Sequence, residues 1–245
     1  MSECILILGA TSAIARGVAA AFAVRGDNLY LASRDEDELR RSAADLQLRY
    51  GVTVHYRVFD AEATETHEAF FNAVLADTPD LSGVVLAFGY LGDQLAARDF
   101  AVAAKVIASN FTGAVSILGL CANYFEPLQR GFIIGISSVA GDRGRQSNYV
   151  YGAAKGALSL YLQGLRNRLY PHGVRVITVK PGFVDTAMTY GLPGLFLVAT
   201  PQQIGQRIVA TLGKPADVVY LPGFWRYIML IIKHIPEFVF KRMKM

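Results

Sequence analysis

Short apolar runs separated by helix-length segments dominate the chain. The first run, Cys4 to Leu8 (CILIL), contains no charged residue, which is typical of a strand buried on both faces of a parallel sheet. Similar runs follow at Asn28 to Ala32, Val52 to Phe59, Val84 to Ala87, Phe132 to Ile136, Val174 to Lys180 and Val218 to Leu221. Strands that alternate with helices predict an α/β fold: a doubly wound parallel sheet of about seven strands, with ligands at the carboxyl ends of the strands.

A turn of small residues follows the first predicted strand. The segment from Gly9 to Gly17 (GATSAIARG) leads into an apolar helical pattern, Val18 to Val24. Free backbone amides and the positive end of the dipole at a helix N-terminus attract a pyrophosphate. The turn therefore predicts nucleotide binding, although Ala13 and Ala15 stand where a full glycine fingerprint has its second and third glycines. The alternative is that small residues only allow the helix to pack closely on the strand.

The end of the second predicted strand bears on the choice of nucleotide. An acidic residue there binds the ribose hydroxyls of NAD, whereas a basic residue accommodates the 2′-phosphate of NADP. The sequence Ser33-Arg34-Asp35 places a guanidinium at this point, which favours NADP(H). Asp35 weakens the preference, and an ordinary solvated arginine is the alternative. Asp60, which closes the third predicted strand, is a candidate for an adenine contact.

Three residues in the second half of the chain carry candidate chemistry. Ser138 stands thirteen positions before Tyr151, and Lys155 stands four positions after it. Residues four apart share one face of a helix, so the ammonium of Lys155 is expected to stabilise the phenolate and lower the pKa of Tyr151 toward neutrality. A tyrosine with such a pKa exchanges protons near working pH. The set predicts hydride transfer at a carbonyl; a chance Y-x-x-x-K spacing is the alternative.

Together these segments resemble the short-chain dehydrogenase/reductase family over nearly the whole chain. The resemblance implies a single-domain Rossmann-like fold and four catalytic residues: Asn110, Ser138, Tyr151 and Lys155. It implies that Tyr151 donates a proton to a keto oxygen, that Ser138 hydrogen-bonds this oxygen, and that Lys155 holds the nicotinamide ribose. Asn110 would hold a water in the proton relay.

The same resemblance implies a cofactor-binding set. Its members are Gly9, Thr11, Ser12, Ile14, Arg34, Asp60, Ala87, Gly89, Tyr151, Lys155, Pro181, Gly182, Val184 and Thr186. Within this set, the segment from Pro181 to Thr186 resembles the P-G-x-V-x-T segment by which the family contacts the nicotinamide. NADP(H) is the expected cofactor, with NAD(H) as second choice. Ala13, Ala15 and the segment Ala87-Phe88-Gly89, where the family usually has N-A-G, depart from the family pattern and bear on cofactor affinity. The family also implies a homodimer or homotetramer built on helices near Asn110 and Tyr151.

Length and composition narrow the class of protein. The chain has 245 residues, 53% of them hydrophobic, and no linker or repeat divides it. We therefore expect one cofactor-binding domain over residues 1–223 and a separate C-terminal segment over 224–245.

Cys4 and Cys121 form neither a metal motif nor a disulfide framework, and neither a metal nor a nucleic acid is an expected ligand. The first strand begins by residue 4, which leaves no room for a signal peptide, so a cytoplasmic protein is expected.

The C-terminal segment, FWRYIMLIIKHIPEFVFKRMKM, predicts an amphipathic helical tail. Its longest apolar stretch, Tyr227 to Ile232, is far below the roughly twenty residues that span a bilayer, and Pro236 interrupts the remainder of the segment. Aromatic residues beside cations suit the interface of an anionic leaflet, at the inner face of the membrane. Packing on the protein's own core or in a subunit interface is the alternative. The predicted substrate-covering loop, Leu192 to Val198, is also apolar, so both segments favour a lipid-like substrate.

The segment from Ser137 to Gly152 and the tail resemble one group within the family, the decaprenylphosphoryl-2-keto-ribose reductases. This resemblance implies reduction of the 2-keto group of a polyprenyl-phosphate-linked pentose, which completes an epimerisation to an arabinose donor begun by a flavin-dependent oxidase. Arg143 and Arg145 are candidates for the substrate phosphate, with surface arginines as the alternative. Three other functions stay open: a reductase of another apolar ketone such as a steroid or fatty-acyl compound, a non-catalytic NADP(H)-binding regulator, and a soluble reductase whose tail forms only a dimer interface.

Overall fold

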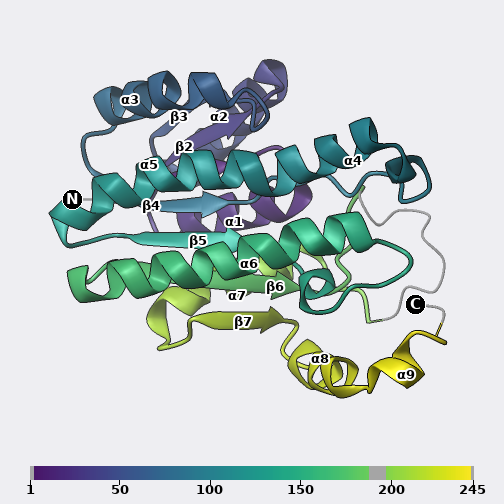
Figure 1. The fold of residues 1–245 in the computed structure, drawn as a ribbon. Coiled ribbons are helices and arrows are strands. Elements are labelled where there is room, and N and C mark those ends of the chain that lie inside the picture. The colour runs from purple at the N-terminus through teal and green to yellow at the C-terminus, as the bar shows by residue number, and fades with distance from the viewer. Residues whose placement is uncertain (1–2, 188–196, 244–245) are drawn as a thin grey trace.

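A single parallel sheet with helices on both faces forms the centre of the molecule (Figure 1). The computed structural model describes residues 3–187 and 197–243. The strands are β1 (Cys4–Leu8), β2 (Asn28–Ser33), β3 (Val54–Val58), β4 (Leu81–Leu86), β5 (Phe132–Ile136), β6 (Arg175–Pro181) and β7 (Val218–Leu221). They lie in the order β3-β2-β1-β4-β5-β6-β7, and all neighbours are parallel. The winding of the sheet reverses between β1 and β4, which is where such folds bind their ligands.

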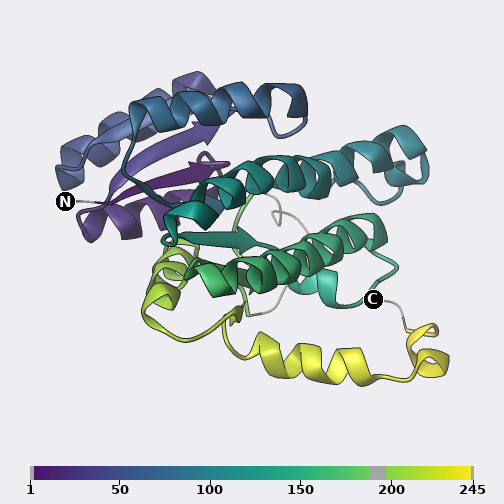
Figure 2. The same cartoon turned by 60° about the vertical axis from the view of Figure 1, so that its left-hand side comes forward.

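Two layers of helices cover the sheet (Figure 2). The helices are α1 (Ala13–Val24), α2 (Glu36–Tyr50), α3 (His67–Asp77), α4 (Phe100–Ile107), α5 (Gly113–Leu128), α6 (Tyr149–Leu169), α7 (Pro201–Ala210), α8 (Trp225–His234) and α9 (Glu237–Phe240). Buried residues of α1, α2 and α7 form one core, and those of α3, α5 and α6 form the other.

The central strand β1 shows why the first apolar run is continuous. Ile5 and Ile7 point into the core under α1, and Leu6 and Leu8 point into the core under α5 and α6. All four side chains have no exposed surface. A strand with helices on both faces needs apolar side chains at every position, so the pattern does not alternate.

The predicted fold is confirmed, and the strand bounds differ where the hydrophobic signal is weak. The third strand is shorter than predicted: β3 covers Val54–Val58 at the edge of the sheet, and Val52 and Phe59 are buried just outside it. β4 begins at Leu81 rather than at Val84, since Ser82 and Gly83 interrupt its apolar run. Gly83 lies under the ring of Phe132, and a Cβ there would stand only 2.1 Å from that ring.

One helical run, Phe100–Leu128, is long and apolar enough to cross a bilayer by length and composition. In this fold it comprises α4, a π-helical turn and α5. Ile117, Leu118 and Phe125 of α5 are fully buried in the core against the sheet. The run is therefore part of the core, and its apolar character follows from that position.

The C-terminal segment leaves the sheet at the edge strand β7. It continues as α8 and α9, which lie beyond the carboxyl ends of the strands (Figures 1 and 2). The predicted helical tail is therefore present, and it lies on the side of the sheet where the ligand site is expected.

Candidate active site

A cleft of about 670 Å³ lies beside β1, β2 and β4, where the winding of the sheet reverses. Its volume is within the range of cofactor sites, roughly 300–1,000 Å³. The predicted cofactor residues that line it are Gly9, Thr11, Ser12, Ile14, Arg34, Asp60, Ala87, Gly89 and Thr186. Tyr151, Lys155, Pro181, Gly182 and Val184 do not belong to its lining.

The turn between β1 and α1 depends on Gly9. Its φ of +82° lies in the left-handed region, and a Cβ there would stand 2.6 Å from the backbone nitrogen of Phe88 at the end of β4. Ser12 caps α1, because its Oγ accepts a hydrogen bond from the amide of Ala15 at 3.2 Å. The turn and the first residues of α1 line the cleft, so the helix N-terminus is placed where an anionic group would bind.

Arg34 lies exposed at the end of the cleft where the second strand finishes. Beside it, the hydroxyls of Thr11 and Ser33 lie 2.8 Å apart in a hydrogen bond. Asp35 has a different role, since its carboxylate accepts a hydrogen bond from the amide of Glu38 at 2.9 Å and caps α2. The structural use of Asp35 removes the main objection to Arg34 as the residue that meets a 2′-phosphate.

Ser138, Tyr151 and Lys155 come together where β5 meets α6. The hydroxyl of Ser138 hydrogen-bonds the phenol of Tyr151 and accepts a further bond from the amide of Ala140 at 3.1 Å. The ammonium of Lys155 donates to the carbonyl oxygen of Ile136 at 3.2 Å and lies 5.9 Å from the centre of the Tyr151 ring. Tyr151 and Lys155 are 9% and 3% exposed, so both act in a largely dry environment.

Asn110 lies in the π-helical turn between α4 and α5, a local form that often marks functional sites. Its Nδ2 donates to the carbonyl oxygens of Tyr90 at 2.6 Å and Val106 at 2.8 Å, and its Oδ1 accepts from the amide of Tyr90 at 3.2 Å. A Cβ on Gly89 would stand 2.8 Å from the Asn110 Oδ1 and 3.0 Å from the Lys155 Nζ. Asn110 and Lys155 thus lie beside Gly89, which lines the cleft.

The protonation of this cluster differs from the sequence-based expectation. Burial raises the pKa of Tyr151 to about 12, and the hydrogen bond from Ser138 opposes the rise. Burial also lowers the pKa of Lys155 to about 8. The expectation that Lys155 lowers the pKa of Tyr151 toward neutrality is therefore wrong, because desolvation of the phenol dominates. At neutral pH the phenol keeps its proton, which is the form that can donate to a keto oxygen.

The predicted nicotinamide segment begins where β6 ends. Pro181 closes the strand, the amide of Gly182 donates to Leu221 at 2.9 Å, and Val184 forms a bridge with Ala199. A Cβ on Gly182 would stand 1.8 Å from the Nε1 of Trp225, so this glycine lets the first turn of α8 pack on the segment. A helix N-terminus and an arginine along one cleft suit a nicotinamide dinucleotide, so the residues that line it fit this cofactor.

Several residues that line the cleft were not among the cofactor-binding residues predicted from the sequence. They are Ala13, Arg16, Ser33, Phe59, Ala61, Glu62, Phe88, Tyr90, Lys105, Ser109 and Ala187. The hydroxyl of Ser109 donates to Glu62, which ties the helix before Asn110 to the segment after β3. Lys105 and Ser109 are four positions apart on the helical run that leads to Asn110, and this spacing could have indicated them.

Arg143, in the segment between β5 and α6, fastens the tail. Its Nη1 donates at 2.6–3.0 Å to carbonyl oxygens at the end of α8 and just beyond: Ile232, Lys233 and Ile235. Its Nη2 pairs with Glu237 at 2.9 Å, and the ring of Phe240 lies 3.9 Å from the guanidinium carbon. A cation at a helix C-terminus satisfies carbonyl groups that lack helical partners. The prediction that Arg143 meets a substrate phosphate is therefore wrong, because the tail occupies its guanidinium.

Arg145 lies under the same tail. Its Nη2 contacts the sulfur of Met229 at 3.3 Å, and burial lowers the pKa of its guanidinium. Within residues 3–187 and 197–243, its buried Nε has no hydrogen-bond partner. A substrate-phosphate role for Arg145 stays a prediction.

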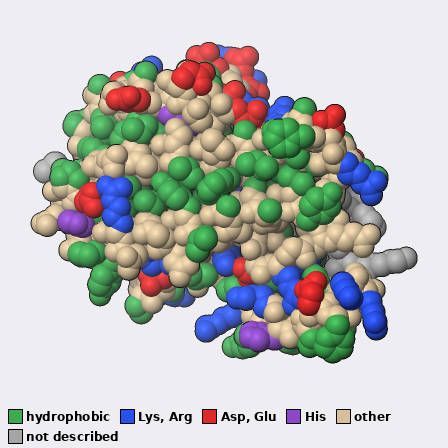
Figure 3. Space-filling model, viewed as in Figure 1, with side chains coloured by type: hydrophobic (Ala, Val, Ile, Leu, Met, Phe, Trp, Pro, Cys, Tyr) green, Lys and Arg blue, Asp and Glu red, His purple; other side chains and the backbone are tan. Residues whose placement is uncertain are grey.

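The tail has an inner and an outer face. Trp225 and Met229 are 2% and 0% exposed and pack with Val139 and Phe183, so the inner face covers the protein's own core. Large apolar side chains on the outer face are 56–69% exposed: Tyr227, Leu230, Ile231 and Phe238. Arg226, Lys233, Lys241 and Arg242 are exposed among them, and Figure 3 shows basic and hydrophobic side chains gathered over this part of the molecule.

The predicted substrate-covering loop, Leu192 to Val198, falls mostly outside the described residues. Its last two members, Leu197 and Val198, are 58% and 44% exposed. They lead into Ala199, which pairs with Val184 of the nicotinamide segment. The loop therefore rejoins the fold beside the predicted nicotinamide site.

Comparison with known proteins agrees with this geometry. The model of the short chain dehydrogenase family matches residues 3–193. An uncharacterized oxidoreductase of Mycobacterium tuberculosis is 35% identical over 240 residues, covering 98% of this chain and 96% of that protein. The match extends well beyond the catalytic segments and includes the C-terminal tail region.

Solved structures share the fold. An actinorhodin polyketide ketoreductase with NADPH is 23% identical, with a TM-score of 0.81, and the similarity covers 91% of this chain and 97% of that one. An alcohol dehydrogenase from Thermococcus sibiricus complexed with 5-hydroxy-NADP is 24% identical, also with a TM-score of 0.81, and covers 97% and 100% of the two chains. At this identity the likeness establishes the architecture alone.

Proposed function

The chain belongs to the short-chain dehydrogenase/reductase family, and on that basis we propose that it is an NADPH-dependent reductase of a polyprenyl-phosphate-linked 2-keto-pentose, acting at a membrane surface. The family membership makes it an NAD(P)-dependent oxidoreductase of alcohol or keto groups. The observation that carries the finer proposal is the attachment of the tail: Arg143, between Ser138 and Tyr151, holds α8, whose outer face is apolar and cationic.

The side chains of the cluster have separate tasks in this reduction. The cofactor, when bound, supplies the hydride that adds to the keto carbon. Tyr151 donates its proton to the keto oxygen, and its raised pKa keeps that proton available at neutral pH. Ser138 hydrogen-bonds the same oxygen and stabilises its developing charge. Lys155 holds the nicotinamide ribose and stabilises the phenolate left on Tyr151, while Asn110 positions the relay water.

The preference for NADP(H) rests on Arg34. It is exposed beside the Thr11 and Ser33 hydroxyls, and Asp35 is engaged as a helix cap. Structural relatives have been solved with NADPH and with 5-hydroxy-NADP, which supports the same preference. NAD(H) is the second cofactor, since the ribose and pyrophosphate contacts are common to both.

The substrate proposal rests on the resemblance between residues 137–152 with the tail and the polyprenylphosphoryl keto-sugar reductases. The ketone would come from a flavin-dependent oxidase acting on the same lipid-linked sugar, and reduction would complete the epimerisation. Arg145 is the candidate for the substrate phosphate, because its buried guanidinium donates to a thioether and carries an Nε without a hydrogen-bond partner among the described residues.

The outer face of the tail supports binding to an anionic membrane from the cytoplasmic side. Tyr227, Ile231 and Phe238 present apolar surface, and exposed arginines and lysines flank them. Each Lys or Arg near an anionic surface contributes about 1 kcal/mol of attraction. A helix of this kind lies in the interfacial plane rather than across the bilayer.

A substrate panel tests the proposal. Purified protein would be assayed for oxidation of NADPH or NADH with a polyprenyl-phosphate 2-keto-pentose or with a soluble ketosteroid. We expect turnover with the lipid-linked sugar and a lower KM for NADPH than for NADH. Turnover confined to the steroid would select the other function that the apolar tail supports, reduction of another apolar ketone. NADPH binding without turnover on any ketone would favour a non-catalytic regulator.

Vesicle binding tests the role of the tail. Deleting it would expose Phe183 and remove the buried Trp225, so surface substitutions are the cleaner variants. We expect Leu230→Glu with Ile231→Glu to lose binding to anionic vesicles at least about tenfold, whereas Leu48→Glu, on the remote helix α2, keeps it. Loss of a homodimer or homotetramer in the double variant, with no vesicle binding by the wild type, would instead identify the tail as a subunit interface.

A further inference from the structure

A buried ion pair joins the turn after Ser138 to strand β6. The side chains of Asp142 and Lys180 are 3% and 13% exposed, and the Lys180 Nζ lies 2.5 Å from the Asp142 Oδ1. The second carboxylate oxygen, Oδ2, accepts a hydrogen bond from the hydroxyl of Tyr220 in β7 at 2.7 Å. Burial and this hydrogen bond raise the pKa of Tyr220, so its phenol keeps its proton and stays a donor. The carboxylate of Asp142 is therefore fixed by groups on two neighbouring strands.

The ion pair closes a short loop that contains Ser138. At one end of the loop, the amide of Ser137 donates to the carbonyl oxygen of Val179 in β6 at 2.8 Å. At the other end, Asp142 pairs with Lys180, the next residue of β6. Ser138 lies between these two attachments, so its hydroxyl is held at a fixed distance from β6.

The same turn rests on α6. A Cβ on Gly141 would stand 2.6 Å from the backbone nitrogen of Gly156 and 2.7 Å from the carbonyl carbon of Lys155. The turn is therefore enclosed between the helix that carries Tyr151 and Lys155 and the strand that carries Lys180. This strand ends one residue later, where the predicted nicotinamide segment begins.

We infer that Asp142 and Lys180 are positioning residues, which hold the proton-donating side of the site in line with the nicotinamide side. Their ion pair sets the distance between the Ser138 hydroxyl and the segment that follows β6. Hydride transfer to a keto carbon and proton transfer to its oxygen require that both sides are aligned on one keto group. The inference rests on the proposed roles of Ser138 and of that segment. Neither Asp142 nor Lys180 belongs to the predicted catalytic or cofactor-binding residues.

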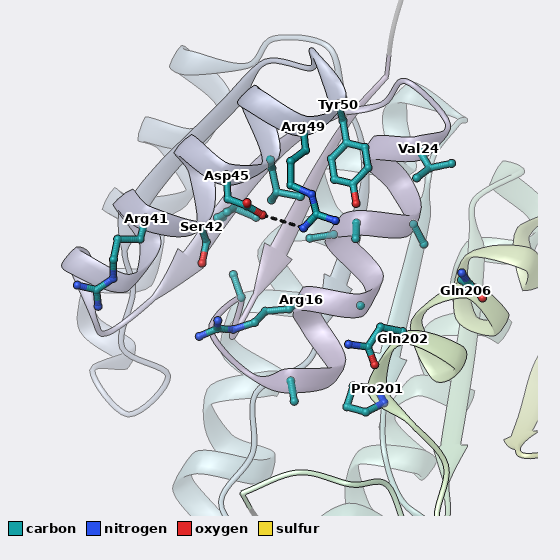
Figure 4. A pocket seen from close by; sticks show the side chains of 18 of the residues that line it. Arg16, Val24, Arg41, Ser42, Asp45, Arg49, Tyr50, Pro201, Gln202 and Gln206 are labelled. Carbon is teal, nitrogen blue, oxygen red and sulfur yellow. Dashed lines mark hydrogen bonds and ion pairs between the residues drawn. The ribbon is translucent and has the colours of Figure 1, made fainter.

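An exposed ion pair elsewhere in the chain provides a matched control. The Arg49 Nη1 and the Asp45 Oδ2 lie 3.3 Å apart on α2, and the two side chains are 60% and 56% exposed. Figure 4 shows this pair in a groove between α1, α2 and α7. Neither residue lines the cofactor cleft. Arg49→Met therefore removes an exposed ion pair without changing the lining of that cleft.

Kinetics of the whole protein test the buried pair, with the ketone of the substrate panel that the wild type reduces fastest. We expect Asp142→Asn and Lys180→Met to lower kcat about ten- to hundredfold and to change the Kd of NADPH less than about threefold. Because both residues act through one contact, the double variant should lose no more than the larger single loss. Lys180→Arg keeps the charge and should recover most of the rate, and Arg49→Met should match the wild type.

Two further measurements separate positioning from loss of folded protein. The primary deuterium isotope effect on kcat, with NADPH deuterated at the transferred position, should rise in the single variants, because hydride transfer becomes slower relative to the other steps. Thermal melts give the folded fraction of each variant. Tyr220→Phe keeps the ion pair and removes one hydrogen bond, so it is the milder variant, with an expected loss in kcat of about two- to tenfold.

Three results would overturn the inference in distinguishable ways. Single variants that melt earlier but keep the wild-type kcat and isotope effect per folded molecule would give the ion pair a structural role only. Losses in kcat that multiply in the double variant would show that Asp142 and Lys180 act separately. A wild type that reduces no ketone of the panel would contradict the proposed function, and the inference with it.

Discussion

The catalytic cluster and the C-terminal tail lie close together but differ in how far their side chains are buried. Tyr151 and Lys155 are almost fully buried, and Asn110 is held through its amide group by backbone groups. The tail is held by Arg143 and by the packing of Trp225 and Met229, and it leaves its outer apolar face exposed. The cluster is therefore preorganised for one proton transfer, whereas the tail carries apolar surface that no other described part of the chain covers.

This contrast separates what the family shares from what distinguishes this chain. The cluster needs only a keto group and a nicotinamide cofactor, so it serves many substrates. The tail packs Trp225 on Gly182, beside the predicted nicotinamide segment, and contacts the segment that carries Arg143. The proposed substrate choice and membrane location thus rest on the tail, and the family's chemistry rests on the cluster.

Removing the proton donor should have the largest effect. Tyr151→Phe deletes the phenol hydroxyl but keeps the buried ring, so we expect kcat to fall about 10²- to 10⁴-fold with little change in NADPH affinity. Steady-state kinetics and NADPH titration measure the two quantities. Tyr149→Phe, on the same helix and 47% exposed, is the control and should retain activity. Activity near the wild-type rate in Tyr151→Phe would contradict the role of Tyr151 as the proton donor.

Releasing the tail should cost stability rather than chemistry. Arg143→Ala removes charge-assisted bonds to three carbonyl oxygens from a side chain that is 14% exposed, and we expect a loss of about 2–3 kcal/mol in the free energy of unfolding. Urea denaturation measures the loss in the free energy of unfolding, and limited proteolysis within residues 225–243 measures release of the tail. The exposed Arg242→Ala serves as control. A tail that resists protease equally in both variants would show that Arg143 does not hold it.

The pH dependence should follow Lys155. Its lowered pKa of about 8 means that the ammonium is present below pH 8 and is lost as pH rises through that value. Tyr151, with a pKa of about 12, keeps its proton throughout this range. We therefore expect kcat/KM for ketone reduction to be level from pH 6 to 7.5 and to fall about tenfold by pH 9. A profile that stays level to pH 10 would contradict this role of the ammonium.

Substitutions on the outer face of the tail should have the smallest effect on folding. Ile231 is 69% exposed, so Ile231→Glu should change the free energy of unfolding by less than about 0.5 kcal/mol. Met229→Ala, on the buried inner face of the same helix, should cost about 2–5 kcal/mol. Thermal unfolding of the two variants measures this difference. Equal losses would mean that the outer face is also packed in solution.

The sequence predicted those features that depend on local pattern. The runs that became β1 and β5 needed only hydrophobic periodicity, and Ser138, Tyr151 and Lys155 were found from their spacing. Gly9 could be placed because a tight turn after a buried strand requires it. These features are local, so a single segment carries enough information to define them.

Features that depend on distant contacts were missed. Arg143 was predicted to meet a phosphate, because no local pattern indicates that its partners lie about ninety positions away. The pKa of Tyr151 was predicted in the wrong direction, since the degree of burial depends on how α6 packs on the sheet. The tail was predicted to be amphipathic, but only tertiary packing decides that Trp225 faces inward.

The central claim is that the cluster performs the chemistry and the tail brings the protein to a lipid-linked substrate. The most direct test is NADPH oxidation by the wild type and by Leu230→Glu with Ile231→Glu, on a polyprenyl-phosphate 2-keto-pentose in anionic vesicles and on a short-chain analogue of the same keto sugar in solution. We predict that the double variant loses at least about tenfold on the vesicle substrate and keeps its rate on the soluble one. Equal rates of the two proteins on the vesicle substrate would contradict the claim.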